Sequence, residues 1–127
     1  MKRADARELA FKTIYSKFFN HEEDDELFNN ADQKGLEFTK NILTNFASHY
    51  TDINDIINST LKGYTIDRLN KVDLAILVVA IIELKYIKEN PKEVIVNEAV
   101  NLAKKYSTEK SPKFINGVLA DVIKGEK

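Results

Sequence analysis

The stretch VDLAILVVAIIELKYI, Val72 to Ile87, decides the fold. Its apolar residues do not keep to one stripe of a helix but continue almost all round it. A helix that is apolar on every side has to be covered by other elements. We therefore predict a central buried helix over 72–87. Asn90 and Pro91 end it, because the residue before a proline resists the helical conformation.

Amphipathic helices are indicated on both sides of this stretch, because apolar residues recur there at i, i+3, i+4 and i+7. The predicted helices span 4–19, 35–50, 53–61, 94–106 and 111–125, and a single helical turn lies at 64–70. Thr51 and Asp52 are typical of a helix start and separate the second helix from the third. Val94, Ile95 and Val96 have strand propensity, but no nearby segment offers a pairing strand. Seven helical segments predict an all-α fold, a compact bundle of about seven helices.

Length and composition fit one small domain. The chain has 127 residues, of which 43% are hydrophobic, so we predict a single domain over 1–127 with its own core. It has no cysteine, which excludes disulfides and thiolate metal sites. The longest apolar run, Leu74 to Ile82, has nine residues, whereas a membrane span needs about 20. With no signal-peptide segment at the N-terminus, these features predict a soluble cytoplasmic protein.

Motifs for catalysis and metal binding are missing from the sequence. Neither of its two histidines, His21 and His49, belongs to a metal-binding motif such as HExxH. No phosphate-binding loop motif occurs, and four glycines are too few for one. We therefore predict a binding module rather than an enzyme, without cofactor or metal.

Charge is distributed unevenly along the chain, although the net charge is only −1. Residues 1–17 include five basic and two acidic residues, and 104–113 include four lysines and one glutamate. Between them, 20–33 has six acidic residues, no lysine and no arginine, and is predicted to be a loop. The two basic clusters could form one nucleic-acid-binding patch in the fold, or each could be a solvated end.

Basic and aromatic residues at two predicted helix starts favour RNA as the ligand. Arg3 and Arg7 are four residues apart, so they share one helix face, with Lys2 beside them. Arginine binds phosphate through two N–H groups and stacks on unpaired bases. Lys113 and Phe114 lie in the first turn of the last helix, where free backbone N–H groups attract anions. Phe114 could stack on a base there, or it could pack in the core.

Four segments give the chain a specific resemblance. They are ARELAFKTIYS at 6–16, RLNKVDLAIL at 68–77, VIVNEAVNLAKKYS at 94–107 and KFINGVL at 113–119. In this order and at this spacing they resemble the NusB family of bacterial transcription antitermination factors. The resemblance implies two antiparallel three-helix bundles. It also implies binding of boxA-type single-stranded RNA in leaders of ribosomal RNA operons, jointly with the small-subunit ribosomal protein NusE, to seed an antitermination complex on RNA polymerase.

The same resemblance implies RNA-binding roles for individual residues. Lys2, Arg3 and Arg7 occupy the place of the family's arginine-rich N-terminus, which contacts RNA. Lys113 and Phe114 match a Lys-Phe pair on the RNA side, which favours ligand contact over core packing for Phe114.

Two further matches concern the protein partner. Tyr15 and Asp73 match positions associated with the ribosomal protein, although Asp73 is also a favourable residue at a helix start. Val78 and Ile82 stand where many family members have arginine and tyrosine. These two apolar residues could support a self-association patch instead.

Asn116 and Gly117 interrupt the last predicted helix, where a glycine costs about 1 kcal/mol relative to alanine. We expect Gly117 to let another backbone pack closely, so that Gly117→Leu would destabilise the fold. We expect Asn116, whose amide both donates and accepts hydrogen bonds, to bridge groups near the RNA face and to contact RNA.

Two other functions fit the sequence. The chain could be a NusB-like accessory domain that binds RNA for an unlinked partner, or a helical adaptor that binds only protein. Salt dependence would separate the adaptor from the others, because phosphate contacts release counterions.

Overall fold

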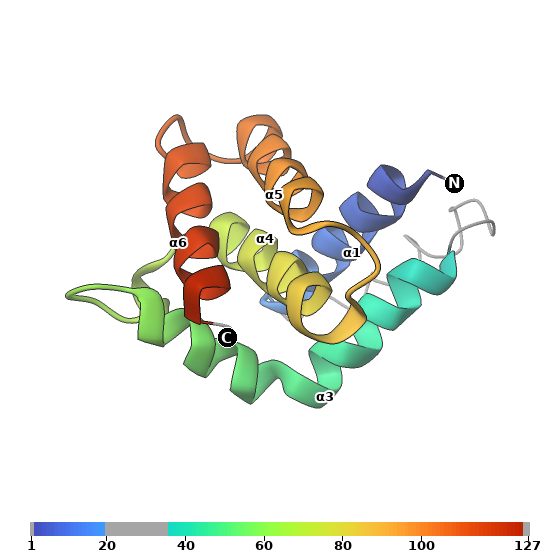
Figure 1. Ribbon diagram of the computed structural model, residues 1–127, viewed down its shortest axis with the longest axis horizontal. Coiled ribbons are helices and arrows are strands. Elements are labelled where there is room, and N and C mark those ends of the chain that lie inside the picture. The colour runs from blue at the N-terminus through green and yellow to red at the C-terminus, as the bar shows by residue number, and fades with distance from the viewer. Residues whose placement is uncertain (1, 20–35, 126–127) are drawn as a thin grey trace.

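The computed structural model describes residues 2–19 and 36–125, and only helices occur within these ranges (Figure 1). The α-helices are α1 (Arg3–Lys17), α3 (Leu36–Thr60), α4 (Lys71–Ile82), α5 (Lys92–Tyr106) and α6 (Ser111–Gly125). A 3-10 turn, η1 (Ile66–Arg68), precedes α4, and a π-helical segment, η2 (Glu83–Ile87), extends it. The all-α prediction is confirmed. The acidic loop predicted at 20–33 lies outside the described residues.

One continuous helix, α3, replaces the two helices predicted between residues 35 and 61, so that prediction was wrong. Ile53 continues the buried face to which Ile42 belongs, across Thr51 and Asp52, which are both exposed. A side-chain cap is worth about 1 kcal/mol, less than burying the isoleucines of this face, at about 1.5–3 kcal/mol each. The described residues therefore contain five α-helices and the short segments η1 and η2, and not the predicted bundle of about seven helices.

The central helix is α4, as predicted, and every residue from Asp73 to Ile82 is buried. It contacts α1, α3, α5 and α6, which lie around it in Figure 1. Val78 and Ile82 are 0% exposed. The self-association patch suggested for these two residues is therefore wrong, because their side chains belong to the core.

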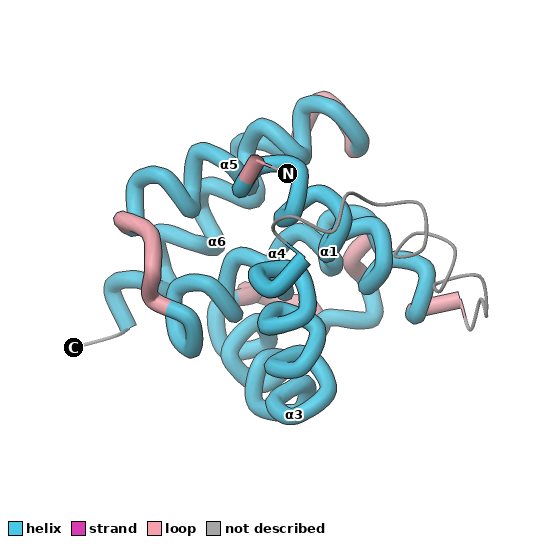
Figure 2. Tube along the Cα trace, turned by 90° about the vertical axis from the view of Figure 1, so that its right-hand side faces the viewer, coloured by secondary structure: helices cyan, strands magenta, loops and turns pink. Residues whose placement is uncertain are grey.

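The helices form two groups that share α4. Helices α1, α3 and α4 contact one another in the first group, and α4, α5 and α6 do so in the second. Figure 2 shows α5 and α6 on one side of α4 and α3 on the other. The two antiparallel three-helix bundles implied by the family resemblance need six α-helices. The described ranges hold five, so that division stays a prediction.

The chain turns sharply between α4 and α5. η2 ends at Lys88, whose φ of 57° and ψ of 31° lie in the left-handed region, and the Lys88 N–H donates to the Glu83 carbonyl at 2.9 Å. Pro91 then precedes the first residue of α5. The helix predicted to end at Ile87 is confirmed, with its last five residues in π-helical form.

Candidate nucleic-acid interface

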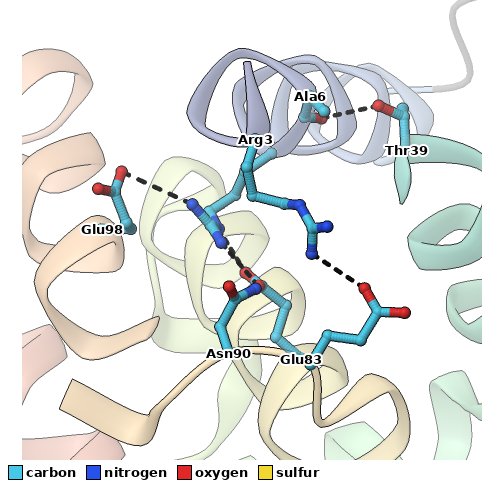
Figure 3. A network of polar contacts seen from close by, with 8 residues as sticks. Arg3, Ala6, Thr39, Glu83, Asn90 and Glu98 are labelled. Carbon is cyan, nitrogen blue, oxygen red and sulfur yellow. Dashed lines mark hydrogen bonds and ion pairs between the residues drawn. The ribbon is translucent and has the colours of Figure 1, made fainter. Parts of the chain in front are cut away.

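Arg7, predicted on an RNA-binding face, is buried between α1 and the end of α4. It donates two hydrogen bonds to the Glu83 carboxylate, from Nε at 2.5 Å and from Nη2 at 2.8 Å. Asn90 donates to the same carboxylate at 3.3 Å, and a Glu98 oxygen lies 3.7 Å from Arg7 Nη1 (Figure 3). Since Arg7 is only 3% exposed, its guanidinium joins α1 to η2 and presents no surface to a ligand.

Lys2 and Arg3, in contrast, are exposed at the start of α1. The Arg3 guanidinium lies 4.2 Å from the ring centroid of Phe38 on α3. Its Nη1 donates to Glu89 at 2.9 Å, in an ion pair whose side chains are 46% and 51% exposed. Such exposed pairs contribute little to stability. Arg3 is therefore held in place by Phe38, and a phosphate can compete with Glu89 for its guanidinium.

Side-chain contacts between α1 and the α5 region follow the same order along both segments. Arg3 near the start of α1 contacts Glu89, just before α5, and Glu8 further along α1 contacts Tyr106 at the end of α5. Arg3 therefore lies near the start of α5, whereas Lys12, from the same basic cluster, lies over the ring of Tyr106 at its end, next to the cluster at 104–113. The 15 residues of α5 span about 22 Å, so the basic residues of the two clusters are spread along a line and do not form one compact patch.

Glu8 is an acidic residue between the two clusters, and its charge is compensated. Lys105 Nζ donates to it at 2.7 Å and Tyr106 Oη at 2.5 Å. Burial raises the pKa of Glu8, but these two hydrogen bonds and the charges of Lys105 and Lys12 together outweigh burial and hold the pKa below 4.5. The hydrogen bond that Lys105 donates to Glu8 in turn raises the pKa of Lys105 above its usual value. Glu8 is therefore ionised at neutral pH and paired with a cation.

A pocket of about 390 Å³ lies at the start of α6 and contains residues that sequence analysis missed. Phe114 lines it together with Tyr64, which is 37% exposed, and with Arg68 and Lys110. Tyr64 and Arg68 come from the segment before α4, so only the fold brings them to Phe114. Two aromatic rings and two cations around one hollow suit an unpaired base and its phosphate. The clue in the sequence was an aromatic and a basic residue within five positions.

Phe114 packs partly in the core and partly lines the pocket, so its stacking on a base stays a prediction. Lys113 beside it is exposed. Neither role therefore excludes the other.

Asp73 is buried at the start of α4, and its carboxylate is occupied by hydrogen bonds. It accepts from Ser107 Oγ at 2.6 Å, from Ser111 Oγ at 3.0 Å and from Asn70 Nδ2 at 3.1 Å. Ser111, the first residue of α6, thereby ties the start of that helix to α4. Asp73 is only 6% exposed, so it influences the surface by holding in place the segments that it joins. These segments form part of the wall of the Phe114 pocket.

Gly117 lies on the open side of α6. It is exposed, and a Cβ there would meet no atom of the described residues within 4 Å. The expectation that Gly117 permits close helix packing is therefore wrong. Asn116 is also exposed and lines a groove of about 360 Å³ with Val96 and Ile123. Since this groove is separate from the Phe114 pocket, the RNA contact of Asn116 stays a prediction.

Tyr15 belongs to an aromatic cluster at the end of α1. Its ring meets that of Phe19 edge-on at 5.1 Å and lies 6.4 Å from that of Phe11. Phe19 is 46% exposed, so the cluster reaches the surface. The partner contact expected of Tyr15 stays a prediction.

Metal binding and membrane insertion find no support in the described ranges. No group of three or more histidine, cysteine, aspartate or glutamate side chains within 2–19 and 36–125 could hold a metal ion. His49 stacks on Tyr86 with ring centroids 4.0 Å apart, and His21 lies outside the described residues. Among the helices listed above, none is both long and apolar enough to span a bilayer.

Comparison with known proteins places the chain in a family. The family model described as the NusB family matches residues 4–124. The chain belongs to the NusB family. This confirms the resemblance seen in the sequence. The match covers all five α-helices of the described residues except Arg3, the first residue of α1, and Gly125, the last residue of α6.

Relatives and solved structures of NusB proteins match along nearly their whole length. The transcription antitermination protein NusB of Finegoldia magna is 42% identical over 98% of this chain and 95% of the relative. The protein of the same name from Listeria innocua is 37% identical over 100% of both chains. T. maritima NusB superimposes with a TM-score of 0.87 at 30% identity, covering 98% of this chain and 92% of that one.

A second solved structure contains a NusB protein in an assembly. It is a crystal structure of antitermination factors NusB and NusE in complex with dsRNA. The matched chain in it superimposes with a TM-score of 0.85 at 32% identity, covering 97% of this chain and 96% of that one.

Proposed function

We propose that this chain is a transcription antitermination factor that binds boxA-type single-stranded RNA from the leaders of ribosomal RNA operons. It acts in the cytoplasm with the small-subunit ribosomal protein NusE, and the pair seeds an antitermination complex on RNA polymerase. Its role is binding and not catalysis. The observation that carries the proposal is the set of exposed cations along α1 and α5 that ends at the aromatic pocket of Phe114.

The proposed RNA track begins at Lys2 and Arg3 and ends at Lys113 and Phe114. The 15 residues of α5 between them span about 22 Å, which corresponds to roughly six nucleotides at about 3.4 Å for each stacked nucleotide. Lys12 adds a cation at the C-terminal end of α5, where its Nζ lies 5.6 Å from the ring centroid of Tyr106. A row of separated cations suits a backbone of regularly spaced phosphates, and it suits a compact anion less well.

Specificity is assigned to the Phe114 pocket, because stacking needs an unpaired base. Tyr64 and Phe114 offer ring surface there, and Arg68 and Lys110 offer positive charge. Phosphate contacts along α1 and α5 fix the position of the strand but carry no sequence information. Asn116 is proposed to contact the strand beyond the pocket.

Arg7 is left out of the proposed contact set. Its hydrogen bonds to Glu83 fix the start of α1 against η2, so it acts as a positioning residue for Arg3 and Lys2.

The proposed partner is NusE, in line with the solved complex of a NusB protein with NusE. Tyr15, in the partly exposed aromatic cluster with Phe19, is the proposed direct contact. Asp73 is proposed to act indirectly, by holding the α5–α6 turn through Ser107 and Ser111.

Fluorescence anisotropy with a labelled boxA-like RNA tests the proposal. We expect tight, salt-sensitive binding that NusE strengthens, with a scrambled strand and a duplex of the same sequence binding more weakly. Phe114→Ala removes a stacking surface worth about 1–3 kcal/mol, so affinity should fall by roughly ten- to a hundredfold. Arg3→Ala should weaken all RNAs alike and reduce the slope of log affinity against log salt by about 1.

A matched control is Lys40→Ala, which removes an exposed α3 cation outside the proposed track and should leave RNA affinity unchanged. Equal binding of boxA-like, scrambled and duplex RNA would overturn the boxA proposal and favour an accessory RNA-binding domain. Binding to NusE without any RNA affinity would favour a protein-only adaptor.

A further inference from the structure

A larger hollow, of about 770 Å³, lies where η2, the start of α5 and the end of α6 meet. Lys85, Lys88 and Lys92 contribute to its wall, and Leu84 and Ile95 are buried residues of its lining. None of the proposed RNA contacts lines this hollow. It borders Gly125, at the opposite end of α6 from the Phe114 pocket. The NusB-family function proposed above makes no use of it.

Among the described residues, no carboxylate forms an ion pair with the lysines around this hollow, Lys85, Lys88 and Lys92. Glu83, a carboxylate in the lining, is bound to Arg7 and Asn90 instead. All three lysines are exposed, so a ligand can reach their ammonium groups.

The backbone of Lys88 gives an independent reason to assign a role to its side chain. Lys88 is the one non-glycine residue with positive φ in the described ranges, at 57°. A helix end in the left-handed region is usually occupied by glycine or asparagine, because a Cβ is unfavourable there. Lys88 therefore carries a side-chain ammonium group at this turn, although its backbone conformation is one that glycine would adopt without strain. Left-handed residues of this kind cluster at ligand sites.

We propose that this hollow binds a phosphoryl group through Lys85, Lys88 and Lys92. A phosphoryl group carries several acceptor oxygens and a high negative charge, so it can bind three ammonium groups at once. Two sources offer this chemistry. One is a phosphodiester of an RNA strand that continues past Arg3, whose ion-pair partner Glu89 is the neighbour of Lys88 in sequence. The other is a free phosphorylated small molecule.

The first arm of the test uses pyrophosphate alone and needs no RNA. Pyrophosphate is titrated into the full chain while backbone amide signals are followed by NMR, and the largest shifts are expected over 84–92. Lys88→Gly should weaken binding by about five- to tenfold, because one charge-assisted contact is lost. Its melting temperature should stay the same or rise, because glycine relieves the left-handed conformation. Lys40→Ala, which removes an exposed lysine on α3, is the charge-matched control and should bind like the parent chain.

The second arm distinguishes the two sources. The boxA-like RNA is compared with the same RNA extended by a few nucleotides at either end. If the extension tightens binding to the parent chain but not to Lys88→Gly, the phosphoryl group belongs to RNA. If pyrophosphate binds and the extension has no effect, the site takes a free phosphorylated molecule.

The proposal is overturned if pyrophosphate leaves the amides of 84–92 unshifted. It is also overturned if Lys88→Gly and Lys40→Ala bind pyrophosphate equally well. Loss of boxA selectivity would overturn the proposed function but would leave the pyrophosphate arm intact, so the two failures are distinguishable.

Discussion

Arg7 and Glu8 are neighbours in α1, yet their ion pairs differ in almost every physical respect. The side chains of Arg7 and Glu83 are 4% and 1% exposed, and two hydrogen bonds join them. The pair of Glu8 with Lys105 has a lysine that is 61% exposed. A buried charge that loses its partner cannot be solvated, whereas an exposed one can. The first pair therefore holds the fold together, and the second mainly sets the charge of a surface.

The largest expected effect on stability comes from breaking the buried pair of Arg7 and Glu83. Glu83→Ala should lower the free energy of unfolding by about 3–5 kcal/mol, because Arg7 stays buried without its partner. Urea denaturation followed by circular dichroism measures this. The double variant Arg7→Met with Glu83→Leu should recover most of the loss, since no buried charge remains. A loss of less than about 1 kcal/mol for Glu83→Ala would place this pair in the same class as the exposed one.

The next largest effect is expected at Asp73, a buried carboxylate that is bound by neutral donors and not by a cation. Its contribution to the free energy of unfolding can be compared with that of the Arg7 pair. Asp73→Ala should lower the free energy of unfolding by about 2–3 kcal/mol, because the hydroxyls of Ser107 and Ser111 lose their acceptor. The same denaturation experiment measures it. Ser111→Ala removes one donor only and should have a smaller effect. Equal losses for the two variants would mean that a single hydrogen bond accounts for the whole contribution.

A smaller effect of opposite sign is expected on the exposed side of α6. Gly117→Ala should raise the free energy of unfolding by about 0.5–1 kcal/mol, because alanine favours the helix and its Cβ meets no atom of the described residues within 4 Å. Thermal unfolding followed by circular dichroism measures it. A lower melting temperature would show that the open space beside Gly117 is filled in solution.

The smallest effect concerns the exposed pair and depends on pH. The folded-state pKa of Glu8 lies below 4.5, so its contribution is complete above the unfolded-state value. That contribution is lost as the pH falls through the folded-state pKa. Glu8→Gln should therefore reduce stability by about 0.2–1 kcal/mol at pH 7, and the difference should shrink as the pH falls through the folded-state pKa. A difference that does not change with pH would have to come from packing.

The sequence predicted the helices that local patterns define. The central helix followed from the all-round apolar character of 72–87, and the spans of α5 and α6 followed from their apolar spacing and from Pro91 and Ser111. The division of α3 was wrong because the cap signal at Thr51 and Asp52 was given more weight than the apolar face that runs through it.

The candidate site was less predictable, because its contacts join distant segments. Arg7 and Glu83 are separated by 76 positions, and no period in the sequence relates them. A clue was present nonetheless, since a glutamate inside an apolar stretch needs a buried partner. Tyr64 likewise reaches Phe114 only through the fold. Residues at exposed helix starts, such as Arg3 and Lys113, stood on the surface as their neighbours in sequence suggested.

The burial of α4 in both groups of helices has a consequence for synthesis of the chain. When α1 and α3 have left the ribosome, neither group can close, because the helix that they share has not yet been made. Even after α4 has been made, Asp73 lacks two of its hydrogen-bond donors, because Ser107 and Ser111 are synthesised later. We therefore expect the described helices to fold as one cooperative unit, and the backbone amides of α4 to exchange with solvent only when the two groups of helices open together.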